Sequence, residues 1–443
     1  MIKKYNCFIK TVNNSFVLFN PHTFASAVIQ NTKNYQEQEV LQALSPEQQA
    51  ALFDKDIFIK DSNYAISMSR YYSNKVKYSR SLTISDAMTY ACNMQCVYCF
   101  ENGIKNKVKH FPTDERISMI TNLLNLYRSD IDHLDYVFFG GEPLLLPNYV
   151  EKVCSFISDH YIDIATTYSI TSNGTLINEE FITLCNKYNF KEIRITIDGP
   201  KRIHDRRRPM KNGESSYNRI LDNIKILCKR TNIRIVIGTV LDSESIDTYL
   251  ELARDLVNEF GDYILSDSPH IFFSLGTLCE PLFQTDHTKN NSFLTIDNLA
   301  YYRLSEELLK MGATITSPFY SAHCINSLEK AFVITPSCDI YKCVSGMGCD
   351  HFKLSSYMDF MENPLKLVKH NIGHIEISHL PQCKNCEYLS MCNGGCKFQY
   401  KEHMLPLCRK PLLDAEMEAL LRLLAFGHFT RGGDFKKRDD ITL

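Results

Sequence analysis

The sequence of 443 residues has no long apolar run, no continuous apolar stretch near its start and no strong excess of charge of either sign. No apolar run reaches the about 18 residues that a helix needs to cross a bilayer, so we expect no membrane partner. The first thirty residues lack the apolar core of a signal peptide, so we expect no export. The formal net charge of -2 gives no electrostatic case for nucleic-acid binding.

Cysteine, in contrast, is abundant, with 17 residues. Without an export signal we expect a reducing, cytoplasmic compartment, where clustered cysteines bind metal more often than they form disulfides. One group lies in a single short stretch: Cys92, Cys96 and Cys99, with Tyr98 directly before the last of them. Three thiolates bind only three irons of a [4Fe–4S] cluster and leave the fourth iron open; a zinc site is the alternative.

A second group of cysteines lies toward the C-terminus. Four of them follow the spacing CxxCx5CxxxC: Cys383, Cys386, Cys392 and Cys396. Sets of four suit closed iron–sulfur clusters or zinc. The surrounding region has few long apolar runs, and small irregular regions of this kind need a metal to hold them. Electron-driven chemistry is therefore the leading hypothesis.

The middle of the chain alternates between strand-like and helical patterns. Amphipathic stretches such as 115–127, 178–189, 217–229 and 246–260 separate the strand-like runs. The strand-like runs are 81–85, 136–140, 167–174, 193–199, 233–240 and 270–276. Six such runs separated by helices predict an α/β fold with a parallel sheet or an open, partial barrel.

Polar and glycine-rich motifs follow several of these strands. They are the first cysteine group, the GGEP motif at 140–143, the SNG motif at 172–174 and the IDG motif at 197–199. In parallel β/α folds the functional sites lie at the C-terminal ends of the strands, so we expect these motifs to converge on one mouth. Two adjacent glycines in GGEP would let the backbone approach a ligand closely.

The first 79 residues read as a small separate α+β domain. The pattern predicts a strand at 16–20, a short helix at 23–30, helices over 37–44 and 45–55, and a closing strand at 56–60. Ser45 is a candidate N-cap because Pro46 follows it. At the other end of the chain, residues 412–426 predict an amphipathic helix.

The motifs at 92–99 and 140–143 together resemble those of the radical S-adenosylmethionine (SAM) enzymes, and the resemblance covers most of residues 80–410. It implies a partial (β/α)6 barrel in which Cys92, Cys96 and Cys99 bind a [4Fe–4S] cluster with an open iron that chelates SAM. In that family the reduced cluster cleaves SAM, and the resulting 5′-deoxyadenosyl radical abstracts a hydrogen from the substrate. Those three cysteines are therefore the expected catalytic residues.

The same resemblance assigns further side chains to SAM. Glu142 is expected to accept a hydrogen bond from the methionine ammonium and Thr196 to bind the ribose. His204-Asp205 followed by arginines is similar to an HDxxR motif: Arg208 fits its spacing and Arg207 comes one residue early. One arginine would pair with the SAM carboxylate, which suits its fork geometry; a solvated basic run is the alternative. The implied SAM-binding residues are Tyr98, Gly140, Gly141, Glu142, Asn173, Thr196, Arg207 and Arg208.

The C-terminal cysteines resemble those of the SPASM domain, which carries two auxiliary [4Fe–4S] clusters. The resemblance implies that the distal cluster is held by Cys383, Cys386, Cys392 and Cys408. It implies that the nearer cluster is held by Cys324, Cys343 and Cys396. Cys338 replaces a glycine of the family pattern, and Pro318 stands where some members have another cysteine. The nearer cluster therefore either keeps an open iron or recruits Cys338, Cys349 or Cys279.

We therefore expect three domains: residues 1–79, possibly recognising a leader peptide or else capping the barrel; the barrel at 80–300; and the SPASM domain at 301–443. The resemblance implies maturation of a ribosomally made precursor peptide by a side-chain cross-link, with flavodoxin or ferredoxin as electron donor. Alternatives are a formylglycine-forming sulfatase maturase, a small-alcohol dehydrogenase and a non-catalytic iron–sulfur scaffold. Sulfatase maturases carry an Asp after the cysteine that matches Cys343, where this chain has Val344.

Overall fold

The computed structural model describes residues 1–60, 67, 79–103, 112–277, 298–316, 325, 328–370, 382–383, 386–392, 408, 410–429 and 435–437. The chain divides into two compact units. The terminal unit consists of Met1–Tyr78, Asp297–Ser327 and His374–Leu443, and the barrel unit of Ser79–Ile296 and Leu328–Gly373. Each unit is thus assembled from separated stretches. The three-domain division drawn from the sequence stays a prediction.

The barrel unit is built on six neighbouring parallel strands, in the order β10-β9-β8-β7-β6-β5. The strands are β5 (Ser81–Thr89), β6 (His133–Gly140), β7 (Ala165–Ser172), β8 (Phe190–Thr196), β9 (Arg234–Leu241) and β10 (Ile271–Thr277). All six strands predicted from the sequence are therefore confirmed. Because each strand pairs with the next one in the chain, their C-terminal ends meet at one edge.

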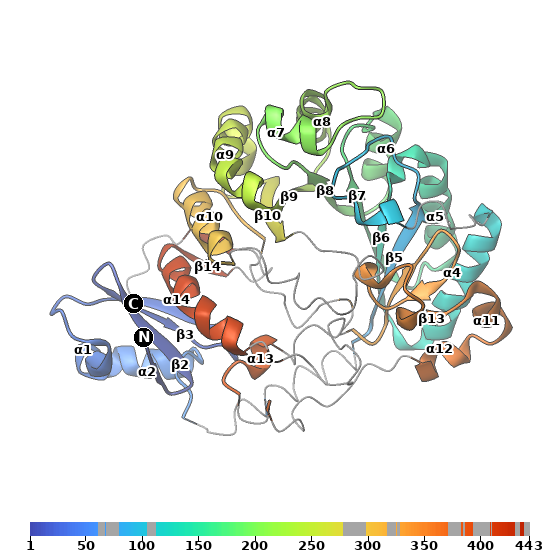
Figure 1. Cartoon of the computed structure of the whole chain (residues 1–443). Coiled ribbons are helices and arrows are strands. Elements are labelled where there is room, and N and C mark those ends of the chain that lie inside the picture. Colours follow the sequence, from blue (N-terminus) through green and yellow to red (C-terminus); the bar gives the residue numbers. More distant parts are fainter. Residues whose placement is uncertain are drawn as a thin grey trace. The chain divides into compact units, whose positions relative to one another are not determined.

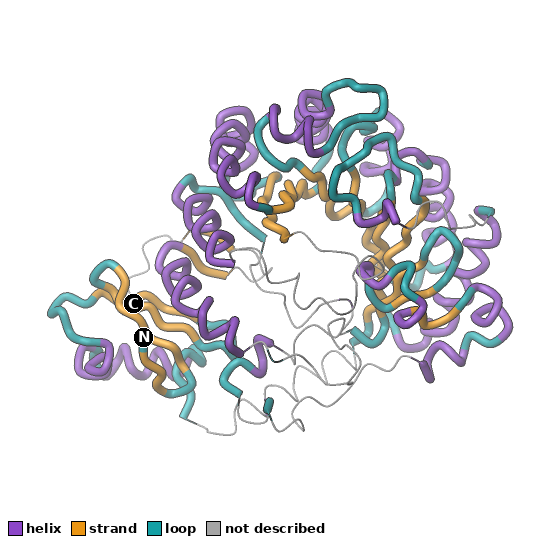
Figure 2. The backbone as a smooth tube through the Cα atoms, viewed as in Figure 1, coloured by secondary structure: helices purple, strands orange, loops and turns teal. Residues whose placement is uncertain are grey.

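Helices connect these strands and lie outside their curved row (Figure 1). They are α4 (Thr113–Tyr127), α5 (Pro147–His160), α6 (Glu179–Lys187), α7 (Lys201–Arg207), α8 (Ser216–Arg230) and α9 (Ser243–Ile264). The tube view shows the same arrangement of strands inside and helices outside (Figure 2). The architecture is a partial β/α barrel, as the alternating pattern predicted. No helix in the described part of the chain is both long and apolar enough to cross a bilayer.

Aromatic side chains fill the space between strands and helices. Tyr136, Phe138 and Tyr168 are almost fully buried, and the rings of Phe138 and Tyr168 stack with centroids 6.2 Å apart. Phe190 joins the same cluster at 5.5 Å from Tyr168. Large buried rings contribute both apolar area and preferred ring geometry to a core. This packing fixes the strands whose ends carry the polar motifs.

The sheet continues beyond β5 with strands from much later in the chain. β11 (Ala331–Ile334) pairs in parallel with β5, and β12 (Ile340–Tyr341) and β13 (Lys353–Ser355) add antiparallel pairs. Two short helices follow, α11 (Tyr357–Glu362) and α12 (Leu365–His370). The segment that carries Cys338 and Cys343 is thus part of the barrel unit, a connection that the sequence pattern did not predict.

The terminal unit contains an antiparallel sheet in the order β1-β2-β3-β4. Its elements are β1 (Ile2–Lys4), β2 (Cys7–Val12), β3 (Ser15–Phe19), β4 (Ser26–Gln30), α1 (Val40–Ala43), α2 (Pro46–Asp54), α10 (Asn298–Lys310), α13 (Leu389–Cys392), α14 (Lys410–Phe426), β14 (Gly427–Phe429) and β15 (Phe435–Lys437). Short 3-10 helices in the two units are η1 (Glu37–Glu39), η2 (Phe100–Gly103), η3 (Arg128–Asp130), η4 (Pro143–Leu145), η8 (Val344–Gly346) and η9 (Asp350–Phe352).

Two predictions for the N-terminal residues are wrong, and those of the helices over 37–44 and 45–55, the strand at 16–20 and the Ser45 N-cap are confirmed. Residues 26–30 form strand β4 rather than a helix, because pairing with β3 and the alternating burial of a β-branched segment outweigh local helix propensity. Residues 56–60 form no strand: two of their N–H groups bond to Leu52 O at the end of α2, and Asn20 binds the carbonyls of 56 and 57. The strand at β3 is confirmed, and the Ser45 hydroxyl caps α2 by accepting from the Gln48 N–H.

Both faces of this sheet are covered. One face packs with α1 and α2 in a cluster that includes Cys7, Phe16 and Leu52. The C-terminal helix α14, predicted as amphipathic, contacts β2, β3 and β4, and Lys10 of β2 forms an ion pair with Glu418 of α14 at 2.9 Å. The first and last segments of the chain therefore share one core.

Candidate active site

The first cysteine group lies in the loop that follows β5. Two backbone bonds join the start of this loop to the end of β6: Gly141 N–H donates to Thr89 O at 2.8 Å and Glu142 N–H donates to Ala91 O at 2.9 Å. A side chain at Gly140 or Gly141 would collide with these same backbone oxygens, at 2.4 and 2.2 Å. The two glycines thus allow the GGEP segment to lie directly against the cysteine loop.

The other side of the cysteine loop lies along residues 207–211. Val97 N–H donates to Arg207 O at 2.9 Å, and Gln95 N–H donates to Pro209 O at 2.9 Å. Met94 and Met210 form an antiparallel bridge between the two segments. The loop is therefore held between the end of β6 and the segment that follows α7, although these segments are far apart in the sequence.

The three cysteines of the loop lie close enough to influence one another. Burial raises the pKa of the Cys96 thiol, the positive charge of Arg208 opposes this rise, and Cys92 and Cys99 add to it. In the described part of the chain, no three Cys, His, Asp or Glu side chains surround a single point as ligands of one ion would. A [4Fe–4S] cluster attaches each thiolate to a different iron, so its ligands need not converge in that way.

Glu142 is fully buried and held by three donors. Its carboxylate accepts from Leu144 N–H at 3.0 Å, the Ser172 hydroxyl at 2.8 Å and Asn173 N–H at 2.7 Å. Burial raises the pKa of Glu142, and these hydrogen bonds and Arg208 lower it. Among the described residues, no Lys or Arg lies within ion-pair distance of this carboxylate. A buried carboxylate without a cation is costly, so the site fits a positively charged ligand group.

Tyr98, Asp198 and Arg208 form a second buried group beside the loop. The Tyr98 hydroxyl donates to the Asp198 carboxylate, and Arg208 donates to the Tyr98 oxygen at 2.6 Å. Asp198 also accepts from Val240 N–H at 3.0 Å. Burial raises the pKa of Tyr98 above its usual range, so the phenol stays protonated and can donate.

The two neighbouring arginines have different surroundings. Arg207 pairs with Asp242, donates to Val240 O at 3.1 Å and lies 3.6 Å from Asp198. Arg208 makes its one side-chain bond among the described residues to Tyr98, and its buried Nε, like that of Arg207, has no hydrogen-bond partner there. Arg207 thus has two acidic partners in the fold, whereas Arg208 has none among the described residues and lies beside the cysteine loop.

Two further motif residues are His204, which has a partner in the fold, and Thr196, which lies at the end of β8. His204 is buried and accepts from the Asp198 N–H at 3.2 Å through Nδ1. Burial and the nearby Arg208 lower the pKa of His204 to about 3, so the ring is neutral. Thr196 ends β8 and is half-buried, and its assignment to the ribose stays a prediction. The roles of His204, which lies in α7, and of Asp242, which directly follows β9, were missed.

Asn173 lies against the cysteine loop rather than in an isolated turn. Its amide Nδ2 lies 3.8 Å from the Cys92 sulfur and donates to Asn93 Oδ1 at 2.7 Å. Thr175 donates to the side-chain Oδ1 of Asn173 with both its N–H and its hydroxyl. Asn93 and Thr175 were also missed; the only sequence signal was their position inside the cysteine motif and directly after SNG.

The four cysteines predicted to hold the distal cluster all lie among the described residues. Burial raises the pKa of the Cys383 thiol to about 11, and the charges of Cys392, Cys386 and Cys408 add to the rise. Cys386 N–H donates to Cys383 O at 3.0 Å, which closes a tight turn between the first two. The described portion of the chain holds 14 free cysteines and no disulfide.

The nearer set is described only in part. Cys343 directly precedes η8 in the barrel unit, whereas Cys324, Cys396 and Cys279 lie outside the described residues. Cys338 is fully buried with φ +56°, a left-handed conformation that favours glycine and explains the glycine of the family pattern. It occupies a turn between β11 and β12, where Cys338 N–H donates to Thr335 O at 2.8 Å.

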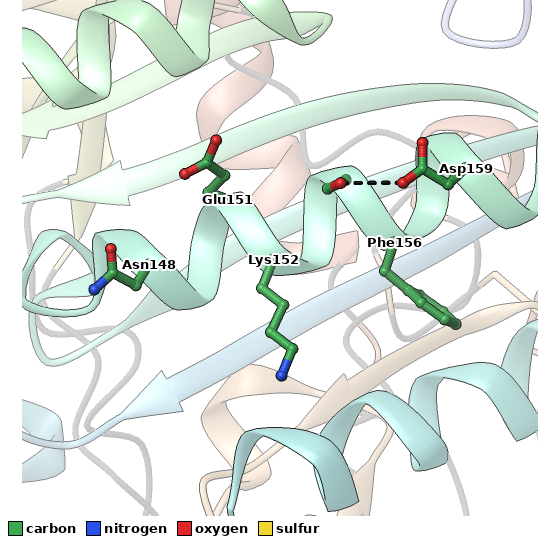
Figure 3. Close-up of a pocket in the computed structure, with 6 residues that line it drawn as sticks. Asn148, Glu151, Lys152, Phe156 and Asp159 are labelled. Carbon is green, nitrogen blue, oxygen red and sulfur yellow. Dashed lines mark hydrogen bonds between the residues drawn. The ribbon is translucent and has the colours of Figure 1, made fainter.

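A shallow hollow on the outer face of α5 is separate from these motifs. Its lining comes from residues about one helical turn apart, and Figure 3 shows Glu151 and Asp159 pointing to one side of the helix and Lys152 to the other. Lys152 pairs with Asp114 at 2.6 Å and Glu151 with Lys187 at 3.3 Å. The hollow is the solvated polar face of a helix and shows no converging ligands.

Comparison with known proteins agrees with this geometry. Residues 87–256 match the profile of the Radical SAM superfamily. These residues are a radical SAM domain, the module of enzymes that use a [4Fe–4S] cluster and SAM for radical chemistry.

Three curated proteins show how far the sequence similarity extends. An uncharacterized protein, MJ0907 of Methanocaldococcus jannaschii, is 35% identical over 38% of this chain, which spans only 56% of that protein's length. The cysteine-type anaerobic sulfatase-maturating enzyme of Clostridium novyi is 28% identical over 69% of this chain and 85% of its own. The radical SAM cyclopropyl synthase TigE of Paramaledivibacter caminithermalis is 24% identical over 78% and 75%.

Two solved structures share the fold. Native anSMEcpe with bound AdoMet and Kp18Cys peptide gives a TM-score of 0.59 at 20% identity and covers 78% of this chain and 99% of its own. Streptococcus suis SuiB bound to precursor peptide SuiA gives a TM-score of 0.50 at 14% identity and covers 89% and 94%. At these identities the likeness shows the fold alone.

Proposed function

We propose that this protein is a radical SAM maturase that forms a side-chain cross-link in a ribosomally made precursor peptide. The observation that carries the proposal is the pair of complementary buried groups beside the cysteine loop. Among the described residues, Glu142 is a carboxylate with no cation at ion-pair distance, and Arg208 is a buried cation with no acidic partner. A ligand with both an ammonium and a carboxylate, such as the methionine end of SAM, would satisfy both groups.

The chain's own residues divide the binding task. Cys92, Cys96 and Cys99 would hold the cluster, which together with SAM supplies a 5′-deoxyadenosyl radical when bound. Glu142 would accept from the ammonium with its Oε2, which has one bond from Asn173 N–H. Arg208 would donate to the carboxylate, and Tyr98 keeps that guanidinium in place. A non-catalytic scaffold would leave Glu142 and Arg208 without a purpose.

Arg208→Ala is expected to weaken SAM binding by tens-fold or more, because loss of one partner of a desolvated charge pair costs ~2–5 kcal/mol. Arg207→Ala is the matched variant one residue away. It removes the partner of Asp242 and Asp198, so it should lower thermal stability and leave SAM affinity near that of the wild type once the protein is folded.

Both variants are compared by calorimetric SAM titration at constant iron content. Arg208→Lys keeps the positive charge but loses the forked guanidinium, so its SAM affinity should lie between those of the wild type and Arg208→Ala. Wild-type affinity in Arg208→Ala, with weak binding in Arg207→Ala, would assign the carboxylate to Arg207 instead.

A peptide is the substrate class that the similar proteins favour. One of them is a cyclopropyl synthase, one a sulfatase-maturating enzyme, and SuiB is solved with a precursor peptide. This supports a peptide maturase over a dehydrogenase of a small alcohol.

A sulfatase maturase is the second candidate, supported by the 28% identity to the Clostridium novyi enzyme. Against it stands Val344, which follows Cys343 at the start of η8 and has no proton-accepting group. Incubation with the Kp18Cys peptide separates the two functions, because only a sulfatase maturase should convert it to an aldehyde.

The remaining parts of the proposal concern the cell. A cytoplasmic location and reduction by flavodoxin or ferredoxin agree with the free thiols of the described cysteines.

The distal cluster would be held by Cys383, Cys386, Cys392 and Cys408. Cys343, with Cys324 and Cys396, would hold the nearer one, and the turn position of Cys338 disfavours it as a fourth ligand.

The terminal unit has an open strand edge that suits an extended leader peptide. β4 pairs with β3, and no described strand lies beyond it. Backbone bonds of Asn20 to Ala25 and of Asn31 to Asn14 fix which pairs of this ladder are bonded. Because bonded and non-bonded pairs alternate in antiparallel sheets, the N–H and C=O of Val28 point away from β3. An added strand would bind there.

Val28→Pro is expected to raise the KM for the precursor peptide by roughly two- to tenfold, from loss of one hydrogen bond of ~0.5–1.5 kcal/mol. SAM cleavage without peptide should not change. Val28→Ala keeps the N–H and serves as the control. Equal KM values in all three proteins would exclude leader binding at this edge. Deletion of the whole segment is a poorer test, because it would expose the face of α14 that packs on β2 and β3.

A further inference from the structure

Three side chains beside the cysteine loop close a ring of hydrogen bonds. Asn173 Nδ2 donates to Asn93 Oδ1 at 2.7 Å. Asn93 Nδ2 donates to Thr175 Oγ1 at 2.8 Å. The Thr175 hydroxyl donates to Asn173 Oδ1 at 2.7 Å. Each member donates once and accepts once around the ring, so the ring fixes the direction of all three bonds.

The ring also fixes which way the Asn173 amide faces. Its Oδ1 accepts from both the hydroxyl and the N–H of Thr175, at 2.7 and 2.9 Å, so the oxygen must face Thr175. The amide nitrogen then faces the cysteine loop. One of its two N–H groups is used by Asn93, and the nitrogen lies 3.8 Å from the Cys92 sulfur. Asn173 and Thr175 are 5% and 4% exposed, so water does not compete strongly.

Cys92 receives a second donor from its own loop. The Met94 N–H points at the same sulfur at 3.4 Å. Of these two donors, the Met94 N–H belongs to the backbone and the Asn173 amide depends on the ring. The ring is therefore the part of this arrangement that side-chain substitution can alter without a change to any cysteine.

We propose that Asn93 and Thr175 are positioning residues that aim the Asn173 amide at Cys92 and thereby raise the reduction potential of the cluster on that thiolate. The inference rests on the proposed function for the identity of that cluster. Hydrogen bonds to cluster sulfurs are among the factors that set its potential. A reduced cluster carries more negative charge than an oxidised one, so a donor to its sulfur favours the reduced form.

The test compares Thr175→Val with Thr175→Ser. Valine has the shape of threonine without the hydroxyl, so it opens the ring, whereas serine keeps the hydroxyl and the ring. Asn93→Ala opens the ring from the other side. Redox titrations of reconstituted enzyme are followed by electron paramagnetic resonance, and the signal that changes on SAM addition identifies the cluster of the first cysteine loop.

Thr175→Val and Asn93→Ala should retain iron and show a lower potential for that signal. At a fixed solution potential, the ratio of reduced to oxidised cluster should fall about tenfold. This corresponds to a reduction potential lower by ~59 mV for a one-electron couple. Thr175→Ser should titrate like the wild type. Wild-type potentials in Thr175→Val and Asn93→Ala would overturn the inference.

Loss of the SAM-responsive cluster in both ring-opening variants would also overturn it, because the ring would then hold the loop and not set the potential. Absence of any SAM-responsive signal in the wild-type enzyme would instead contradict the proposed function. The two failures are therefore distinguishable in one experiment.

Discussion

Replacement of Cys92, Cys96 and Cys99 together by alanine is expected to abolish formation of 5′-deoxyadenosine and to remove about one third of the bound iron. The estimate takes each of three predicted sites as a cubane, or about 12 iron atoms per chain. The loss of activity should be complete, because the loop that follows β5 contains no cysteine besides these three. Iron analysis and chromatography of the SAM products measure both effects.

The remaining iron is the internal control of this variant. The distal cysteines lie in the terminal unit and the mutated ones in the barrel unit, so loading of the distal set should be unaffected. 5′-Deoxyadenosine from the triple variant would show that SAM is cleaved elsewhere. Loss of all the iron would show that the clusters do not assemble independently.

The second large effect concerns stability. Arg116 of α4 pairs with Asp86 of β5, and both side chains are nearly inaccessible. The same guanidinium donates to Thr335 O at 2.8 Å, so it joins the first barrel strand to the turn between β11 and β12. Tyr136 and Tyr149 each donate to Asp86 at 2.7 Å. The group links elements from three distant parts of the chain.

Arg116→Ala should lower the unfolding free energy of the barrel unit by ~3–5 kcal/mol, because it leaves a buried carboxylate without its cation. The two tyrosine hydroxyls still donate to Asp86, so we expect the lower end of that range. Thermal unfolding, monitored by circular dichroism, should shift down by several degrees.

Arg80→Ala is the matched control. Arg80 pairs with Asp132 at 2.8 Å, but both side chains are more than half exposed. Exposed pairs contribute ~0–1 kcal/mol, so this variant should melt close to the wild type. Equal melting temperatures for the two variants would contradict a structural role for the buried pair.

The barrel could be predicted from the sequence because its signals are local. Each strand-like run of β-branched and aromatic residues between amphipathic helices became the expected strand, and the motifs after β5, β6, β7 and β8 lie at strand ends, as predicted. The cysteine spacing likewise predicts which thiols hold a common cluster, and the set of Cys383, Cys386, Cys392 and Cys408 stays a prediction.

What could not be predicted depends on contacts between distant segments. Residues 26–30 carry both helical and strand signals, and pairing with β3 decides between them. The sequence of β11 is too short for its pattern to predict a strand, yet β11 extends the barrel sheet beside β5. No pattern within 172–175 shows that Asn173 and Thr175 meet Asn93, which lies 80 residues earlier than Asn173.

The arginines show the same limit at the level of single side chains. Spacing alone left Arg207 and Arg208 as alternatives, since the motif could be read in two registers. The difference between them comes from Asp242 at the end of β9, which pairs with Arg207 and leaves Arg208 toward Tyr98 and the cysteine loop. A partner that is 35 residues away in the chain cannot be read from the motif itself.

The central claim is the proposal that this protein is a radical SAM maturase that joins two side chains of a peptide, and tandem mass spectrometry tests it most directly. The enzyme is incubated under reducing conditions with SAM and the peptide encoded by a short reading frame beside its own gene, and the product is treated with a hydrazine probe. We expect a loss of two hydrogens for each cross-link, no fragment ions between the joined residues and no hydrazone. A product that forms a hydrazone, or an unchanged peptide despite steady release of 5′-deoxyadenosine, would contradict the account.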